Sequence, residues 1–310
     1  MTAVVYNVDC IAGMPEHLEE GSVDLTVTSI PFADLFTYSH KTEDMGNCGA
    51  SGTDFVGSQF GLHLRFFVEQ LFRVTRPGTN VCIHVQQLVA TKVEHGFIGR
   101  RAFKDDTRKL CEQAGFEWKA EFVIPKNPQA IAQRQHLSSL MFVQGARDSR
   151  QLAPAVNDYV LVFQRPGEAP PVRALRTDKN PGGWVSTNEW IKWAHGVWSD
   201  IRETDVLDGW NHGREEGDEK HVCPLQLEVI RRCVRLYSNP GELVMDPFMG
   251  IGSTAVVALE SGPQMGGAPR RTVGFELKES YHALAERHVA RARAGESPDG
   301  QMLLGAEAVA

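Results

Sequence analysis

Three features are missing from the sequence, and each absence excludes a class of protein. No uninterrupted apolar run approaches the roughly 20 residues that a membrane-spanning helix needs. The first residues, MTAVVYNVDCIAGM, hold neither a basic stretch nor a long apolar run, so an export signal is not expected. The six cysteines form no CxxC pair, and the histidines show no HxxxH or HExxH spacing. We therefore expect a reduced, cytoplasmic protein without membrane association and without a bound metal ion.

Positive charge is in short supply overall, because 32 lysines and arginines face 39 aspartates and glutamates. The charge is unevenly distributed, however. Residues 92–179 hold 15 basic and 10 acidic side chains, and this basic segment lies between two acidic flanks. A basic middle third suits a surface that faces phosphate groups, and it suits a solvated surface without a partner equally well.

Segments with strand and helix character alternate along the chain. At 310 residues the chain suits one large domain, or one domain with a small insert. The expected strands cover residues 4–9, 23–30, 80–85, 116–124, 157–165, 242–247 and 271–276. The expected helices cover residues 14–21, 63–74, 105–115, 224–238, 254–262 and 279–293. This alternation predicts an α/β fold with a mostly parallel sheet and helices on both faces.

Two stretches interrupt the alternation. Residues 33–61 are rich in Gly, Ser, Asp and Asn, which predicts a loop. A turn-rich stretch that begins at residue 166 holds five of the six tryptophans and indicates a small inserted region. The predicted organisation is one half of a domain over residues 1–165, an insert over 166–220, a second half over 221–295 and a loose tail over 296–310.

The sharpest motif is ELVMDPFMGIGST, residues 242–254, in which a hydrophobic strand leads into a glycine loop and then a helix. The candidate ligand-binding residues on this path are Asp246, Pro247, Phe248, Gly250, Gly252, Ser253 and Thr254. Glycines permit a tight turn and let a ligand approach the backbone, although a lone GxG also occurs in purely structural turns. The next strand ends in Glu276, and an acid at that place can accept the ribose hydroxyls of a nucleoside cofactor.

These residues resemble the motifs of amino-group DNA methyltransferases. DPFMGIGST is similar to their S-adenosylmethionine (SAM) loop, GFELKESY to the motif that follows, and HVCPLQLEVIRR to the helix just upstream. VDLTVTSIPF resembles their catalytic strand, and its early position in the chain is similar to the motif order of the β class. The resemblance implies a Rossmann-like SAM-dependent methyltransferase fold with SAM as cofactor. It also implies a site-specific enzyme that methylates a flipped base of double-stranded DNA, in a bacterial cell or a phage-infected host.

By the same resemblance the catalytic residues are Ser29, Ile30, Pro31 and Phe32. Methylation of an exocyclic amine needs acceptors on its two N–H groups rather than a covalent nucleophile. Ser29 Oγ and the main-chain carbonyl of Ile30 can accept these bonds, and Phe32 can stack on the extruded base. Ile30 stands where the family usually has proline, but a carbonyl acceptor survives that change. Ser29 favours N4 of cytosine as the target, with N6 of adenine as the alternative.

The resemblance extends to further contacts. Glu276 is expected to bind the ribose of SAM, Asp9 its adenine amine, and Pro224 and Gln226 its methionine end, although Asp9 is equally suited to a turn or cap. The residues expected to contact DNA are basic and lie in or before the insert: Arg134, Arg173, Arg176 and Lys179. For most of the tryptophans beside them, a role in the core of the insert is favoured.

Several alternatives stay open at this point. A protein-amide methyltransferase uses a related Asn-Pro-Pro-Tyr motif on the same fold, and Ile30 raises the alternative of a catalytically silent SAM- or DNA-binding module. A nicotinamide oxidoreductase is disfavoured because the third glycine of GxGxxG is replaced by Ala255. The partners to be considered are double-stranded DNA, a second copy in a homodimer and a cognate restriction nuclease. The sequence does not give the recognition site or the oligomeric state.

Overall fold

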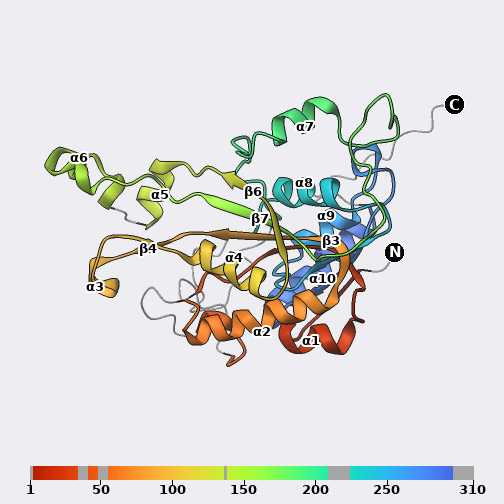
Figure 1. The fold of residues 1–310 in the computed structure, drawn as a ribbon, viewed down its shortest axis with the longest axis horizontal. Helices are drawn as coiled ribbons and strands as arrows, with labels where there is room; N and C mark the ends of the chain where they lie inside the picture. Colours follow the sequence, from red (N-terminus) through yellow and green to blue (C-terminus); the bar gives the residue numbers. More distant parts are fainter. Residues whose placement is uncertain (1–2, 34–40, 48–54, 136–137, 209–223, 296–310) are drawn as a thin grey trace.

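The structure, a computed structural model, describes residues 3–33, 41–47, 55–135, 138–208 and 224–295. These residues form a seven-stranded sheet and a separate two-stranded sheet (Figure 1). In spatial order the large sheet consists of β1 (Ala3–Tyr6), β9 (Arg271–Phe275), β8 (Leu243–Asp246), β2 (Val23–Ser29), β3 (Thr75–Gln86), β7 (Asp158–Gln164) and β6 (Glu117–Ile124). Neighbours from β1 to β3 are parallel, and β7 is antiparallel to both of its neighbours. The expected mostly parallel α/β fold is confirmed.

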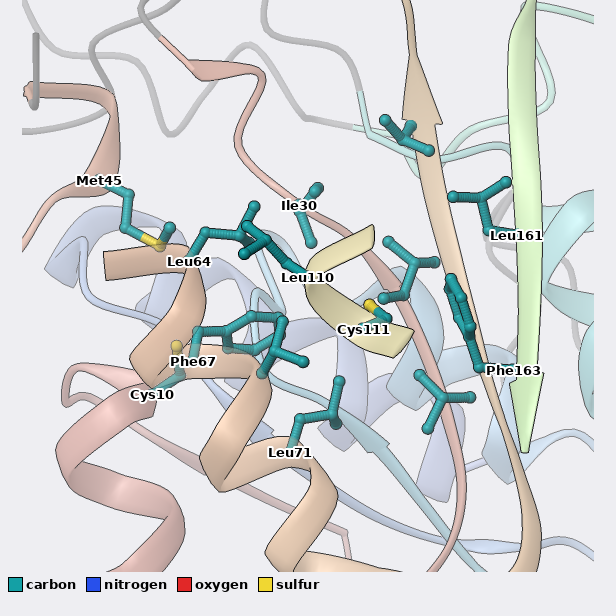
Figure 2. Close-up of a cluster of buried hydrophobic side chains, with 14 of the residues drawn as sticks. Cys10, Ile30, Met45, Leu64, Phe67, Leu71, Leu110, Cys111, Leu161 and Phe163 are labelled. Atoms are coloured by element: carbon teal, nitrogen blue, oxygen red, sulfur yellow. The ribbon is translucent and has the colours of Figure 1, made fainter. Parts of the chain in front are cut away.

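Helices cover both faces of this sheet. One face packs against α1 (Cys10–His17), α2 (Gln59–Val74) and α4 (Phe103–Gln113). The other face packs against α8 (Leu227–Tyr237), α9 (Ser253–Leu259) and α10 (Glu279–Arg293). Figure 2 shows part of the first core, where Leu64, Phe67 and Leu71 of α2 point towards Leu110 and the sheet. Their spacing of three and four residues gives α2 one apolar face, which is why the helix lies along the sheet.

The first helix differs from its prediction. It begins at Cys10 and ends at His17, whereas residues 14–21 were expected to be helical. The reason is Asp9, whose carboxylate accepts a hydrogen bond of 3.0 Å from the N–H of Ala12 and so caps the helix four residues earlier.

Two extensions rise from one edge of the sheet, here called the carboxyl edge, where β2, β3, β8 and β9 end. The first is formed by β4 (Leu88–Ala90), α3 (Lys92–His95) and β5 (Gly99–Arg101), and it directly continues β3. The second is formed by α5 (Pro128–Gln135) and α6 (Phe142–Arg147), between the end of β6 and the start of β7. Figure 1 shows both extensions at the same end of the molecule.

The insert is described as far as residue 208, and Trp210 lies outside the described residues. Its described part holds one helix, α7 (Thr187–Trp193). The predicted role in the core of the insert is confirmed for Trp184 and Trp193, which are buried in one cluster. Trp198 is buried too, but it packs in the core of the large sheet. The Trp198 ring stacks on Phe122 of β6 with a centroid distance of 4.3 Å. Trp190 is 39% exposed on α7.

No helix within the described residues is long and apolar enough to cross a membrane.

Candidate active site

The carboxyl edge brings the two motifs together. Strand β2, which ends in Ser29, pairs with β8, which ends in Asp246 at the start of the glycine loop. Asp246 is buried, and its two carboxylate oxygens each accept a hydrogen bond of 2.6 Å, one from Thr28 Oγ1 and one from Thr254 Oγ1. Through Asp246, Thr28, the residue before Ser29, is connected to both ends of the glycine loop.

Asp246 is electrostatically unusual. Burial raises its pKa to about 6, while the hydroxyl groups of Thr254 and Thr28 and the N–H of Phe248 act in the opposite direction. In the described arrangement its oxygens bind protein groups, so the structure gives Asp246 a role in holding the two strand ends together. The sequence placed it in the cofactor site without revealing these two partners.

The predicted catalytic motif covers the last residue of β2 and the turn that follows. Ile30 and Pro31 are buried, whereas Phe32 is half-buried, with its ring tilted against His84 at 5.8 Å and edge-on to Phe103 at 6.3 Å. The next residue, Ala33, has a φ of 51°, in the left-handed region that residues other than glycine seldom adopt. Such a conformation is sparsely populated and is retained where the surroundings fix it, as they do for this fully buried residue.

Three residues that the sequence did not single out form a chain of contacts that begins at Ser29. Ser29 Oγ lies 2.8 Å from Nδ1 of His84, which is its register partner on β3. His84 Nε2 lies 3.1 Å from Asp158 Oδ2 at the start of β7, and the same Oδ2 lies 2.6 Å from Lys126 Nζ. These side chains come from four segments that meet at the carboxyl edge.

The two glycines of the loop have different reasons to be glycine. Both have positive φ, 56° at Gly250 and 98° at Gly252. A Cβ on Gly252 would lie 3.1 Å from Cα of Ala285 on α10, whereas a Cβ on Gly250 would meet no described atom within 4 Å other than its chain neighbours. Gly252 is therefore needed for the packing of α10, and Gly250 is the position that leaves room beside the backbone.

Glu276 follows β9 and faces this loop. Its Oε2 accepts a hydrogen bond of 2.8 Å from the N–H of Gly250, and its Oε1 accepts one of 2.8 Å from the N–H of Lys278. Although part of the residue is exposed, protein surrounds the carboxyl group, and burial raises its pKa to about 7 against the lowering effect of these N–H groups. Each carboxylate oxygen keeps a further lone pair for an outside donor.

Other residues of the predicted cofactor site lie nearby. Gln226 precedes α8 and Ser253 begins α9, and Gln226 Oε1 and Ser253 Oγ are buried without a hydrogen-bond partner among the described residues. Pro224 is partly buried two residues before Gln226. Asp9 acts as the cap of α1, and burial raises its pKa in spite of the N–H groups of Ala12 and Ile11.

The basic residues of the insert lie away from this site. Because β7 is antiparallel, it ends at the opposite edge of the sheet, here called the amino edge, where Arg165 N–H donates to Thr79 O. Arg173, Arg176 and Lys179 are exposed in the turns that follow. These turns are anchored by Trp184, whose Nε1 donates to Arg235 O in the last turn of α8. Arg134 lies on α5 at the carboxyl edge, but its side chain is outside the described atoms.

Comparison with known proteins agrees with this geometry. A family model, N6_N4_Mtase, described as DNA methylase, matches residues 23–287. The type II methyltransferase M.MthZI of Methanothermobacter thermautotrophicus is 28% identical over 137 residues, which are 43% of this chain and 34% of that protein. The match to the methylase YubD of Escherichia coli covers 33% of its length, so the chain spans about a third of these curated relatives.

Two solved structures share the architecture over nearly the whole chain. TTHA0409 of Thermus thermophilus, solved with S-adenosyl-L-methionine, has a TM-score of 0.61 at 21% identity and covers 94% of both chains. The PvuII DNA methyltransferase, described as cytosine-N4-specific, has a TM-score of 0.57 at 16% identity and covers 96% of this chain and 94% of its own. At such identities the likeness shows the fold, which is the Rossmann-like methyltransferase fold. Because the family model spans most of the sequence, including Ser29 and Glu276, the chain belongs to the N6_N4_Mtase family of DNA methylases.

Proposed function

We propose that the chain is a DNA methyltransferase that transfers a methyl group from SAM to an exocyclic amino group of a base, with N4 of cytosine as the target. The observation that carries the proposal is the junction of Thr28, Asp246 and Thr254, which holds the end of the catalytic strand against the glycine loop. The transfer requires that hydrogen-bond acceptors for the target amine lie close to the binding site of the nucleoside cofactor.

The residues beside the glycine loop fit SAM. Glu276 offers carboxylate lone pairs for ribose hydroxyls, and Gly250 leaves space beside the backbone. Gln226 and Ser253 each carry a buried oxygen without a partner among the described residues, which a polar ligand group would satisfy. When bound, SAM supplies an electrophilic methyl group, so the protein itself needs no nucleophile.

The residues after β2 suit the target amine. Ser29 Oγ and the Ile30 carbonyl would accept its two N–H bonds, which returns electron density to the nitrogen. Phe32 is half-buried beside His84 and would stack against a base that has left the duplex. Serine at this position, by family resemblance, favours cytosine over adenine.

The product identifies the target. Incubation of the protein with SAM and unmethylated DNA, followed by nucleoside mass spectrometry, should yield N4-methylcytosine. N6-methyladenine would move the target to adenine and leave the mechanism intact. The appearance of 5-methylcytosine, or of methylated protein beside unmodified DNA, would overturn the proposed reaction itself.

We place the DNA over the carboxyl edge, because a flipped base must reach Ser29. The extensions at this edge carry exposed basic side chains, among them Lys92, Arg147 and Arg150, and the Phe142 side chain between them in the sequence is 90% exposed. The insert residues Arg173, Arg176 and Lys179 lie beside the amino edge, so they would contact a duplex only if it extended around the molecule.

Two triple variants with equal loss of charge separate these surfaces. Alanine at Lys92, Arg147 and Arg150 should weaken DNA binding for all sequences and flatten the dependence of log affinity on log salt by about 2–3, because each phosphate contact contributes about 0.9 to that slope. Alanine at Arg173, Arg176 and Lys179 serves as the control and should leave the slope unchanged. The reverse result, measured by fluorescence anisotropy, would place DNA over the insert.

A further inference from the structure

The site contains a chain of polar side chains that the proposed acceptors do not explain. Ser29, His84 and Asp158 follow one another across β2, β3 and β7, with contacts of 2.8 Å and 3.1 Å, and Lys126 closes the chain at 2.6 Å. His84 and Asp158 are buried at 7% and 5% exposure. Burial of an imidazole and a carboxylate is unfavourable unless they are paired, whereas two apolar side chains could pack at the same place equally well.

Asp158 stays ionised in this position. Burial alone would raise its pKa, but His84 and Lys126 outweigh burial, and the pKa lies below its ordinary value. The charged groups that face His84 are thus Asp158 on β7 and, behind it, Lys126 after β6. On its remaining sides His84 meets the Ser29 hydroxyl and the Phe32 ring.

The carboxylate determines which imidazole nitrogen carries the proton. His84 Nε2 is buried and lies 3.1 Å from the carboxylate oxygen Oδ2 of Asp158. A negative charge beside Nε2 favours the proton on that nitrogen. Nδ1 is then an acceptor, so the Ser29 hydroxyl donates to Nδ1 in the hydrogen bond of 2.8 Å. The lone pairs of Ser29 Oγ are left free for an outside N–H donor.

We propose that His84, supported by Asp158, is a positioning residue that keeps Ser29 an acceptor and takes up the proton released by the reaction. The proposal rests on the proposed methyltransferase function. As the nitrogen lone pair forms the new N–C bond, the methyl–sulfur bond breaks and its electron pair goes to sulfur. The nitrogen must then lose one proton. Ser29 Oγ receives that proton while its own hydroxyl proton passes to His84 Nδ1, and the resulting imidazolium faces Asp158.

The test replaces His84 with asparagine, which keeps a polar group of similar reach but cannot take up the proton. We expect His84→Asn to lower kcat about 100-fold, in the range of positioned acid–base groups. The affinities for SAM and DNA should change less than about threefold, well below this catalytic loss. His282→Asn is the matched control, since His282 binds the Val5 carbonyl on β1, outside the site. It should keep the wild-type rate.

Two results would overturn the proposal: a His84→Asn protein that keeps more than about a tenth of the wild-type kcat, or one whose SAM affinity falls as much as its kcat. Nitrogen-15 NMR of the imidazoles gives a readout without turnover. It should show His84 with the proton on Nε2, and the Nδ1 signal should move in Ser29→Ala. If the wild-type protein methylated no DNA, the proposed function would fail first, and a proton on Nδ1 would refute the role of His84 separately.

Discussion

Replacement of Ser29 with alanine should lower the turnover number about 100- to 1,000-fold and leave SAM affinity unchanged. In the proposed reaction the hydroxyl accepts a hydrogen bond from the amine as it becomes a nucleophile, so its loss should raise the barrier of the chemical step rather than weaken ground-state binding. Single polar groups of this kind account for factors of that size. Single-turnover kinetics with labelled SAM measures the step, and calorimetry measures the affinity.

A control on the same strand makes this result specific. Thr26 lies three residues earlier on β2, and its hydroxyl is buried without a hydrogen-bond partner among the described residues. Thr26→Val nearly preserves shape and should leave turnover unchanged and stability equal or slightly higher. If Ser29→Ala kept more than about a tenth of the wild-type turnover, the acceptor would have to be another group. Loss of a positioned acceptor lowers turnover by about 100-fold or more.

The scaffold could be predicted from the sequence because its elements carry strong local signals. VDLTVTSI is apolar without alternation, as expected for a strand covered on both faces, and β2 is covered by α2 on one face and α8 on the other. The last helix has the predicted bounds, Glu279–Arg293. The extension with α5 and α6 was missed because its helices are short and bury few apolar side chains, so they leave no period in the sequence.

The chain of contacts from Ser29 through His84 to Asp158 could not be predicted, because local sequence patterns do not determine the order of strands in a sheet. His84 and Asp158 lie 55 and 129 positions after Ser29, and the antiparallel strand β7 brings the third residue back to the first two. One signal was available, because each is a polar residue that adjoins an apolar run: His84 follows VCI in NVCIHV, and Asp158 precedes YVLVF in NDYVLVFQ. The direction of β7 also explains why the insert begins at the amino edge, which charge counting could not show.

Glu276→Gln should lower SAM affinity by about 1–3 kcal/mol, because a carboxylate accepts ribose hydroxyls more strongly than an amide does. The variant keeps the size of the side chain, and its single amide oxygen can accept from one of the N–H groups of Gly250 and Lys278. Glu279→Gln is the control, since Glu279 is exposed in the first turn of α10. Unchanged affinity in a folded Glu276→Gln protein, measured by calorimetry, would remove Glu276 from the cofactor site.

The dependence on pH gives the same residue a second, more specific test. The pKa of Glu276 rises on folding from 4.5 to about 7, so its contribution to the stability of the ligand-free protein is complete below pH 4.5 and is lost as the pH rises through 7. Asp246, raised to about 6, acts in the same direction. SAM affinity should change in the opposite sense, rising through pH 7 as the carboxylate forms. In Glu276→Gln this rise should vanish, and a rise that survived would have to be assigned to another group.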